Sequence, residues 1–407
     1  MLSEVFPRAH ARFASLRLLG PHLNEFIVWL RAQGYSGLPI RLRISATPGL
    51  EARLRRRRVR SLGSLTVAQL LELAPRDSQD DMYRAAVVRS LARYLEAKGV
   101  LARPALTPRA RLVIAYEAHL AQVRGLSAST IAHHGATAAE WLGVVGFDGD
   151  RRALRRAGVR HIETFTRAAS ARVSRASLQH VVAQLRSFLR FLASRGDIEQ
   201  GLDACVDTPR LYRGERLPRS LPWDTVQAFL AAIDRATPMG RRDYAMFLLV
   251  TTYGLRTSEV AALRLEDIEW RAERLRVPRP KIKTPIVLPL TREVGAAVLD
   301  YLRHARPDLP CREVFLRVRA PAGRLAPTAV TEAFQTWSRR CPIAIPHQGP
   351  HCPRHSLAIH LLRQGTALKA IGDLLGHRGA ESTCVYLRLH ADDLRDAALD
   401  LPKGGPT

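Results

Sequence analysis

The sequence predicts a mainly α-helical protein with a small β-sheet or hairpin, and three observations support this fold class. Apolar residues recur at helical spacing along most of the chain. Two short apolar runs, Leu275–Val277 and Ile286–Leu290, flank a basic turn and have the composition of β-strands. The chain has 407 residues, of which 46% are hydrophobic, so it can form more than one core. We therefore expect two or three domains.

The first segment, residues 1–105, is expected to be an accessory region. The pattern Asn24–Gln33 predicts a helix that Gly34 ends. The run Arg53–Arg60 is the densest block of charge in the chain. Such a run either contacts DNA phosphates or forms a solvated helix face, and its composition fits both interpretations equally well.

The second segment, residues 106–207, is predicted to be entirely helical. Its apolar residues follow helical spacing in two places: Leu112, Val113, Tyr116, Leu120 and Val123, and then Leu178, Val181, Leu185, Phe188 and Leu192. Residues 208–222 are rich in Pro and Arg and lack an apolar pattern, which is typical of a basic linker between domains.

The third segment, residues 223–402, is predicted to be mixed. Helical patterns cover Trp223–Asp234 and Arg241–Thr252, the two short strands follow, and helices resume from Thr291. We expect a mainly helical domain with one hairpin.

The charge of the chain predicts a polyanionic partner. Lys and Arg number 63 against 37 Asp and Glu, which gives a formal net charge of +26 and a pI near 11.1. A membrane surface would also attract this charge, but the longest apolar stretch, Tyr244–Leu255, is shorter than the ~20 residues of a spanning helix. The first residues do not resemble a signal peptide. We therefore expect a cytoplasmic protein that binds a polyanion and not a membrane.

Several kinds of site are excluded by their missing motifs. The chain has neither a GxxxxGK[ST] loop nor a GxGxxG turn, and no acidic cluster suits a two-metal nuclease. The sequence HCPRH lacks the glutamate of HExxH, and Pro353 is expected to interrupt a ligand-bearing helix. Cysteines are scattered without a CxxC pair. We expect no metal and no cofactor, even though histidine and cysteine cluster in one region: His347, His351, Cys352, His355 and His360.

An ordered set of short motifs remains in the third segment. The motifs are Gly254–Glu259 (GLRTSE), Lys281, His351–His355 (HCPRH), Leu375–His377 (LGH) and Tyr386. In this order, and with nine residues from His377 to Tyr386, the segment resembles the tyrosine recombinase (phage integrase) family. The resemblance covers the whole third segment as a catalytic domain. The second segment is similar to the family's helical, SAM-like core-binding domain, and the first matches loosely as an arm-like DNA-binding extension.

Two arginines are candidates for stabilising charge on a phosphate. Phosphodiester cleavage without a metal needs cationic donors on the non-bridging oxygens, and planar guanidinium groups suit this task. Most arginines in so basic a chain would lie on the surface or along a DNA backbone. The GLRxSE and HxxRH frames single out Arg256 and Arg354 as catalytic.

Tyr386 is the candidate nucleophile. A tyrosine hydroxyl can attack phosphorus and keep the bond energy in a covalent ester, once its pKa of ~10 is lowered by a base or a positive field. From spacing alone, Tyr386 in CVYLRL could equally be an aromatic residue of a helix core. Its distance from His377 favours the catalytic role that the family resemblance implies.

The remaining roles concern protons. The resemblance places Lys281 at the position of the general acid for the leaving 5′ oxygen, with Lys283 as the alternative. His351 would accept or relay the tyrosine proton, and His377 would hydrogen-bond the scissile phosphate. Glu259 could orient the histidine or lysine network, and His355 is expected to be structural.

The resemblance implies a site-specific recombinase that acts through a 3′-phosphotyrosyl intermediate without metal or ATP. It also implies a homotetramer on two sites in double-stranded DNA. Two alternatives stay open: a type IB-like topoisomerase, and a DNA-binding protein that keeps the fold without catalysis. The sequence leaves open whether the reaction is integration, excision or resolution, and whether the enzyme serves a transposon or another mobile element.

Overall fold

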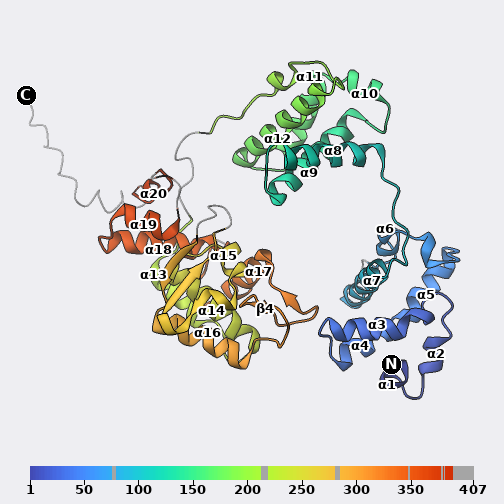
Figure 1. Ribbon diagram of the computed structural model, residues 1–407, viewed down its shortest axis with the longest axis horizontal. Coiled ribbons are helices and arrows are strands. Elements are labelled where there is room, and N and C mark those ends of the chain that lie inside the picture. Colours follow the sequence, from blue (N-terminus) through green and yellow to red (C-terminus); the bar gives the residue numbers. More distant parts are fainter. Residues whose placement is uncertain are drawn as a thin grey trace, which may run out of the picture. The chain divides into compact units, whose positions relative to one another are not determined.

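The computed structural model describes residues 1–75, 79–211, 219–279, 285–346, 349–376, 379 and 381–387. Helices form most of the described chain and the sheets are small, which confirms the predicted fold class (Figure 1). By their contacts, residues 102–215 form one unit, and residues 1–101 and 216–407 form the other. Each of the three segments has a hydrophobic core of its own.

The first segment is a helical body. Its helices are α1 (Leu2–Val5), α2 (His10–Ala14), α3 (Gly20–Ala32), α4 (Gly37–Ser45), α5 (Thr47–Arg56), α6 (Val67–Leu71) and α7 (Gln79–Ala97). Helix α3 begins four residues before the predicted Asn24, because Pro21 lies in its first turn, where no N–H is needed. The buried Glu51 carboxylate accepts the N–H groups of Leu18 and Leu19 at 3.0 and 3.1 Å. The arginine run lies partly in α5 and continues beyond its end at Arg56.

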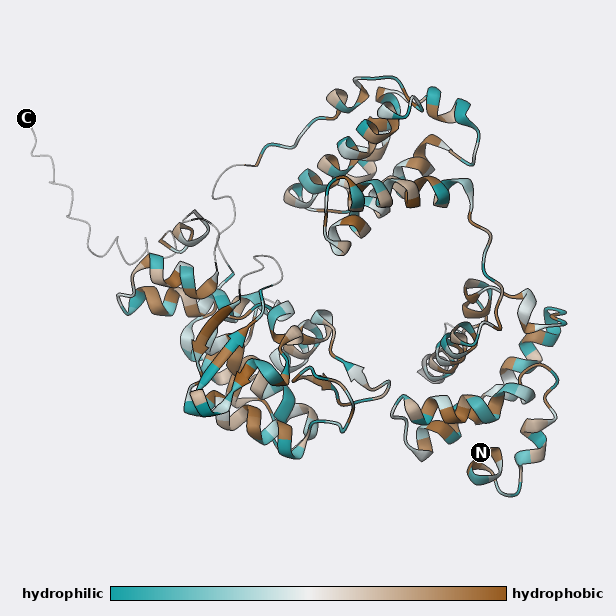
Figure 2. Cartoon of the chain, viewed as in Figure 1, coloured by the Kyte–Doolittle hydropathy of each residue, from teal (hydrophilic) through white to brown (hydrophobic). Residues whose placement is uncertain are grey.

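The regular secondary structure of the second segment is helical in all its described residues, as predicted. Its α-helices are α8 (Pro108–Gln122), α9 (Ala128–Val145), α10 (Arg151–Arg155), α11 (Val159–Ser170) and α12 (Arg175–Ser194). Tyr116, Trp141 and Phe188 are fully buried in its core. Figure 2 shows hydrophobic and hydrophilic residues sharing these helices, as expected for helices with one buried face. Serine and threonine side chains cap several of their N-termini, as Ser174 does for α12.

The third segment contains helices and two small antiparallel sheets. The helices are α13 (Trp223–Ala231), α14 (Pro238–Tyr253), α15 (Thr257–Ala262), α16 (Arg292–His304), α17 (Pro327–Ser338), α18 (His351–Arg363), α19 (Leu368–Leu375) and α20 (Glu381–Cys384). One sheet has the order β1 (Ile268–Glu269), β2 (Arg274–Val277), β3 (Ile286–Pro289), and the other pairs β4 (Leu316–Arg317) with β5 (Gly323–Arg324). The two predicted strands are β2 and β3, with Leu275 opposite Leu288.

Helix α14 forms the centre of the third core. Met246, Phe247, Leu249 and Val250 are all fully buried, although they point around the helix in different directions. A helix that is apolar on every side needs neighbours on every side, which explains the long apolar stretch in the sequence. The helix ends at Gly254, whose φ of +64° is left-handed, and this turn starts the segment that carries Arg256.

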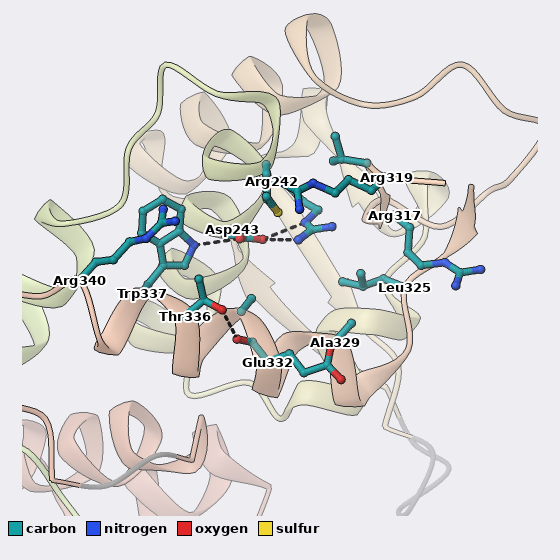
Figure 3. A pocket seen from close by; sticks show the side chains of 13 residues that line it. Arg242, Asp243, Arg317, Arg319, Leu325, Ala329, Glu332, Thr336, Trp337 and Arg340 are labelled. Carbon is teal, nitrogen blue, oxygen red and sulfur yellow. Dashed lines mark hydrogen bonds and ion pairs between the residues drawn. The ribbon is translucent and has the colours of Figure 1, made fainter. Parts of the chain in front are cut away.

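A buried ion pair lies near the N-terminal end of α14. A hollow of about 250 Å³ lies beside it, between α14, α17 and the β4–β5 hairpin (Figure 3). The Asp243 carboxylate pairs with the Arg242 guanidinium at 2.7 Å and accepts the indole N–H of Trp337 at 2.9 Å. Burial raises the pKa of Asp243, and Arg242 opposes that shift. The domain therefore holds two opposite charges in its interior, each stabilised by the other.

None of the helices in the described part of the chain is both long and apolar enough to span a bilayer.

Candidate active site

Tyr386 lies inside the third segment, two residues after α20 ends. Its side chain is 1% exposed and packs in an apolar cluster with Ala358, Ile371 and Leu375. The tyrosine Oη lies 2.8 Å from Nδ1 of His355. Burial raises the pKa of Tyr386, whereas the positive charges of Arg354 and then Arg256 lower it. Burial has the larger effect, so the hydroxyl stays protonated here, and the two arginines offset part of the cost of ionising it.

The first two turns of helix α18 carry His351, Arg354 and His355. The helix begins at His351, and Arg354 and His355 follow at the three- and four-residue spacing that places side chains on one helix face. Pro353 lies in the first turn of this helix and does not interrupt it, so that part of the sequence argument is wrong. A proline is tolerated in the first turn because the N–H groups there have no intrahelical partner.

Arg354 is buried and its guanidinium is held by main-chain oxygens. The side chain is 4% exposed. It donates to the carbonyl of Gly254, at the end of α14, and to the carbonyl of Leu375, at the end of α19. Burial, reinforced by the nearby charge of Arg256, lowers the pKa of Arg354 to about 10. The domain therefore holds this cation at a desolvation cost, as a site that binds an anion would.

Arg256 lies beside it and is oriented by Glu259. Its guanidinium donates to Glu259 Oε1 at 2.7 Å and to the carbonyl of Gly376 at 3.2 Å. The other oxygen of Glu259 accepts the N–H of Arg256 at 2.8 Å. The sequence suggests that Glu259 orients histidine or lysine, whereas the structure shows that its carboxylate fixes an arginine.

Arg279, which sequence reasoning missed, completes the cluster. It follows β2, is 9% exposed, and donates to the carbonyls of Asp373 and Leu374 at 3.4 and 2.6 Å. A helix leaves its last four carbonyls without intrahelical partners. At the end of α19, three arginines bind four consecutive oxygens: Arg279 at 373 and 374, Arg354 at 375 and Arg256 at 376. The turn after α19 and the arginines therefore hold each other in place.

Gly376 makes this arrangement possible. Its φ is +62°, and a Cβ built there would lie 2.3 Å from a terminal nitrogen of Arg279. A side chain at this position would collide with the cluster. The LGH motif therefore needs glycine at this position because of the left-handed backbone and the nearby Arg279 side chain, which the motif alone does not reveal.

We expect Arg279→Ala to lower the free energy of unfolding by about 1–3 kcal/mol, because two carbonyls that it satisfies lose a donor. Arg276→Ala is the matched control, since Arg276 lies on β2 but is exposed and pairs with Glu269 at 3.3 Å. The control should lose at most about 1 kcal/mol. Urea unfolding of both proteins measures the difference, and equal midpoints would contradict the capping role.

Several predicted positions are outside the described residues. They are Lys281, Lys283, His347 and His377, so their roles stay predictions. Of the predicted catalytic residues that are described, Arg256, Arg354 and Tyr386 share one electrostatic environment, and His351 begins the helix that carries Arg354. Among the described residues, no three His, Cys, Asp or Glu side chains gather in a way that could hold a metal ion.

Two family models match the chain. The phage integrase family model covers residues 219–392, and the model of the phage integrase N-terminal SAM-like domain covers residues 113–196. The integrase/recombinase y4rA of Sinorhizobium fredii is 34% identical over 390 residues, which are 94% of each chain. The tyrosine recombinase XerC of Haemophilus influenzae is 30% identical over 220 residues, or 54% of this chain and 72% of its own.

Solved structures show the same fold. The XerH site-specific recombinase, in a post-cleavage complex with palindromic difH substrate, aligns with a TM-score of 0.55 and 14% identity over 70% of this chain and 83% of its own. A lambda integrase tetramer bound to a Holliday junction aligns with a TM-score of 0.52 and 17% identity over 76% and 87%. With a relative matched over nearly its whole length, the chain belongs to the phage integrase family, the tyrosine recombinases.

Proposed function

We propose that this site-specific recombinase cleaves and rejoins DNA with Tyr386 as its nucleophile, through a 3′-phosphotyrosyl intermediate and without metal or ATP. The observation that carries the proposal is the buried cluster in which the charges of Arg354 and Arg256 act on the Tyr386 hydroxyl. Burial also raises the pKa of Tyr83, Tyr94, Tyr116 and Tyr301, but the charges that act on those hydroxyls come from other residues.

The arginines supply the electrostatic part of catalysis. When the tyrosine oxygen attacks, charge grows on the two non-bridging oxygens of the phosphate. Arg354 and Arg256 are already desolvated or oriented by carbonyls and by Glu259, so little reorganisation is needed when a phosphate arrives. Their remaining N–H groups would donate to the phosphate oxygens. Guanidinium groups suit this task because they present several donors in one plane.

We assign the remaining roles as the sequence predicts them. Lys281, or alternatively Lys283, gives a proton to the leaving 5′ oxygen, and His377 hydrogen-bonds the scissile phosphate. Lys281 lies two residues after Arg279, and His377 directly follows Gly376. Both proposed residues therefore adjoin positions that the arginine cluster fixes. For His351, exposed at the start of α18, the sequence predicts that it accepts or relays the tyrosine proton.

The proposed partner is double-stranded DNA, bound by residues 106–207 as a core-binding domain and by residues 223–402 as a catalytic domain. The net charge of +26 supports such binding, and residues 1–105 would add an accessory DNA-binding region. We also propose a homotetramer on paired DNA sites. Its support is the structural likeness to a lambda integrase tetramer bound to a Holliday junction.

Covalent trapping tests the proposed chemistry. Purified protein is incubated in EDTA with plasmid that carries candidate recombination sites, and the reaction is stopped with detergent. We expect a protease-sensitive protein–DNA adduct, and peptide mapping should place the nucleotide on Tyr386. An adduct on another residue, or one that forms only when a divalent metal is added, would refute the proposal.

We expect Arg354→Lys to slow formation of the adduct about 100-fold, in the range seen when one preorganised transition-state donor is lost. Lysine keeps the charge but cannot reach the carbonyls of Gly254 and Leu375 and a phosphate at once. Arg363→Lys, near the end of the same helix, is the control and should cleave at the normal rate. Single-turnover cleavage measures both variants, and equal rates would remove Arg354 from the mechanism.

A further inference from the structure

We infer that His355 is a further catalytic residue: its Nδ1 accepts the Tyr386 proton during cleavage and returns it during rejoining. The sequence alone assigns this role to His351 and predicts a structural role for His355. The inference rests on the proposed role of Tyr386 as the nucleophile.

The geometry places a base directly on the attacking oxygen. Nδ1 of His355 lies 2.8 Å from Oη of Tyr386, a normal hydrogen-bond distance for proton transfer. When the imidazole is protonated on Nε2, the tyrosine O–H donates to the lone pair of Nδ1. The two rings are 5.7 Å apart at 51°, so the contact is made edge to edge by these polar atoms and not by ring stacking.

The surroundings of Tyr386 favour transfer of its proton to a neighbouring side chain over its release to water. Tyr386 is 1% exposed, so bulk water cannot readily take its proton. Arg354, the preceding residue on α18, and Arg256 stabilise the tyrosinate, while Glu259 and Arg279 belong to the same charge cluster. The helix therefore presents the phosphate-binding cation and the base from adjacent positions.

The step balances without any other reactant. In cleavage, the O–H bond of Tyr386 breaks and its proton goes to Nδ1 of His355, while the tyrosine oxygen forms a bond to phosphorus. The bond from phosphorus to the 5′ oxygen breaks, and that oxygen takes its proton from the general acid, for which Lys281 is proposed. In rejoining, the 5′ hydroxyl attacks phosphorus and gives its proton back to the general acid, while the bond from phosphorus to the tyrosine oxygen breaks and the imidazolium returns its proton to that oxygen.

The first test uses His355→Asn and a DNA substrate with sulfur in place of the scissile 5′ oxygen. The Oδ1 atom of asparagine can still accept the tyrosine O–H but cannot take its proton. A thiolate leaves without protonation, so this substrate relieves a defect in the general acid but not one in the base. We expect His355→Asn to form the adduct at least about 100-fold more slowly with both substrates. Lys281→Ala should be restored by the sulfur substrate.

Two controls separate this role from folding and from His351. His304→Asn alters an exposed histidine on α16 that pairs with Asp300, and it should cleave normally. His351→Asn is measured beside it on the sulfur substrate, where it should form the adduct faster than His355→Asn. A normal cleavage rate for His355→Asn, or a defect confined to His351→Asn, would overturn the inference. The adduct on wild-type Tyr386 is measured first, so failure of the proposed function would appear separately.

The pH dependence of cleavage provides a second test, and its first part uses the wild-type protein alone. Its single-turnover rate on the sulfur substrate should fall as the pH is lowered, because a protonated imidazole cannot accept the tyrosine proton. Rejoining from a 3′-p-nitrophenyl phosphate strand should lack this requirement, since p-nitrophenolate leaves without a proton. His355→Asn should rejoin that strand normally. A cleavage rate that does not fall at low pH, or loss of p-nitrophenyl rejoining in a folded variant, would refute the assignment.

Discussion

Tyr386→Phe should bind DNA with wild-type affinity but form no detectable covalent adduct. The substitution removes only Oη, and the ring can stay in the apolar cluster with Ala358, Ile371 and Leu375. Without the hydroxyl, no atom at this position can form the phosphate ester. Detergent-stable attachment of protein to DNA measures the chemistry, and a gel-shift titration at fixed salt measures the binding.

Tyr244→Phe is the matched control for this experiment. Tyr244 lies on α14, and its ring packs against the Arg235 guanidinium at 4.6 Å from the centroid. Removing its hydroxyl should leave adduct formation unchanged. An adduct that persists in Tyr386→Phe would move the nucleophile to another residue. Loss of the adduct in both variants would show that the assay reports folding and not chemistry.

Asp243→Ala should lower the free energy of unfolding by about 3–5 kcal/mol, the cost of leaving one member of a buried ion pair without its partner. Asp243 is 2% exposed and Arg242 is 7% exposed, so both charges are largely removed from water in the folded domain. The indole N–H of Trp337 loses its acceptor in the same variant. Chemical unfolding followed by tryptophan fluorescence measures the loss.

Asp243→Asn separates the two contributions, because the amide oxygen can still accept the Trp337 N–H while the charge is gone. We expect it to be less destabilised than Asp243→Ala. Asp224→Ala, in the first turn of α13, is an external control that should change stability little. If Asp243→Ala lowers the free energy of unfolding by less than about 1 kcal/mol, the pair contributes no more than an ion pair on the surface, and the prediction is wrong.

The fold could be predicted where one element spans many residues. The apolar repeat of α12 and the apolar stretch of α14 are long enough to reveal their helices, and β2 and β3 have four residues each. Strands β1, β4 and β5 have two residues each, so no alternation of side chains can indicate them. Tertiary pairing alone makes them strands.

Some residues of the site could be predicted from the sequence and others could not. Arg256, Arg354 and Tyr386 stand in recognisable motifs, and the structure brings them into one electrostatic cluster. Arg279 and His355 could not be assigned from the chain, because their contacts are remote: Arg279 binds carbonyls 94 and 95 residues away, and His355 meets Tyr386 across 31 residues. Sequence patterns report local spacing and say nothing of such contacts.

The arginine cluster at the end of α19 determines which positions can vary. Its arginines bind main-chain oxygens, which every amino acid supplies, so the exposed side chain of Asp373 carries none of these bonds. Gly254 and Gly376 differ, because both adopt left-handed conformations and a Cβ at either position would lie within 2.4 Å of a neighbouring side chain. In a library selected for recombination, position 373 should accept many amino acids, whereas positions 254 and 376 should accept glycine alone.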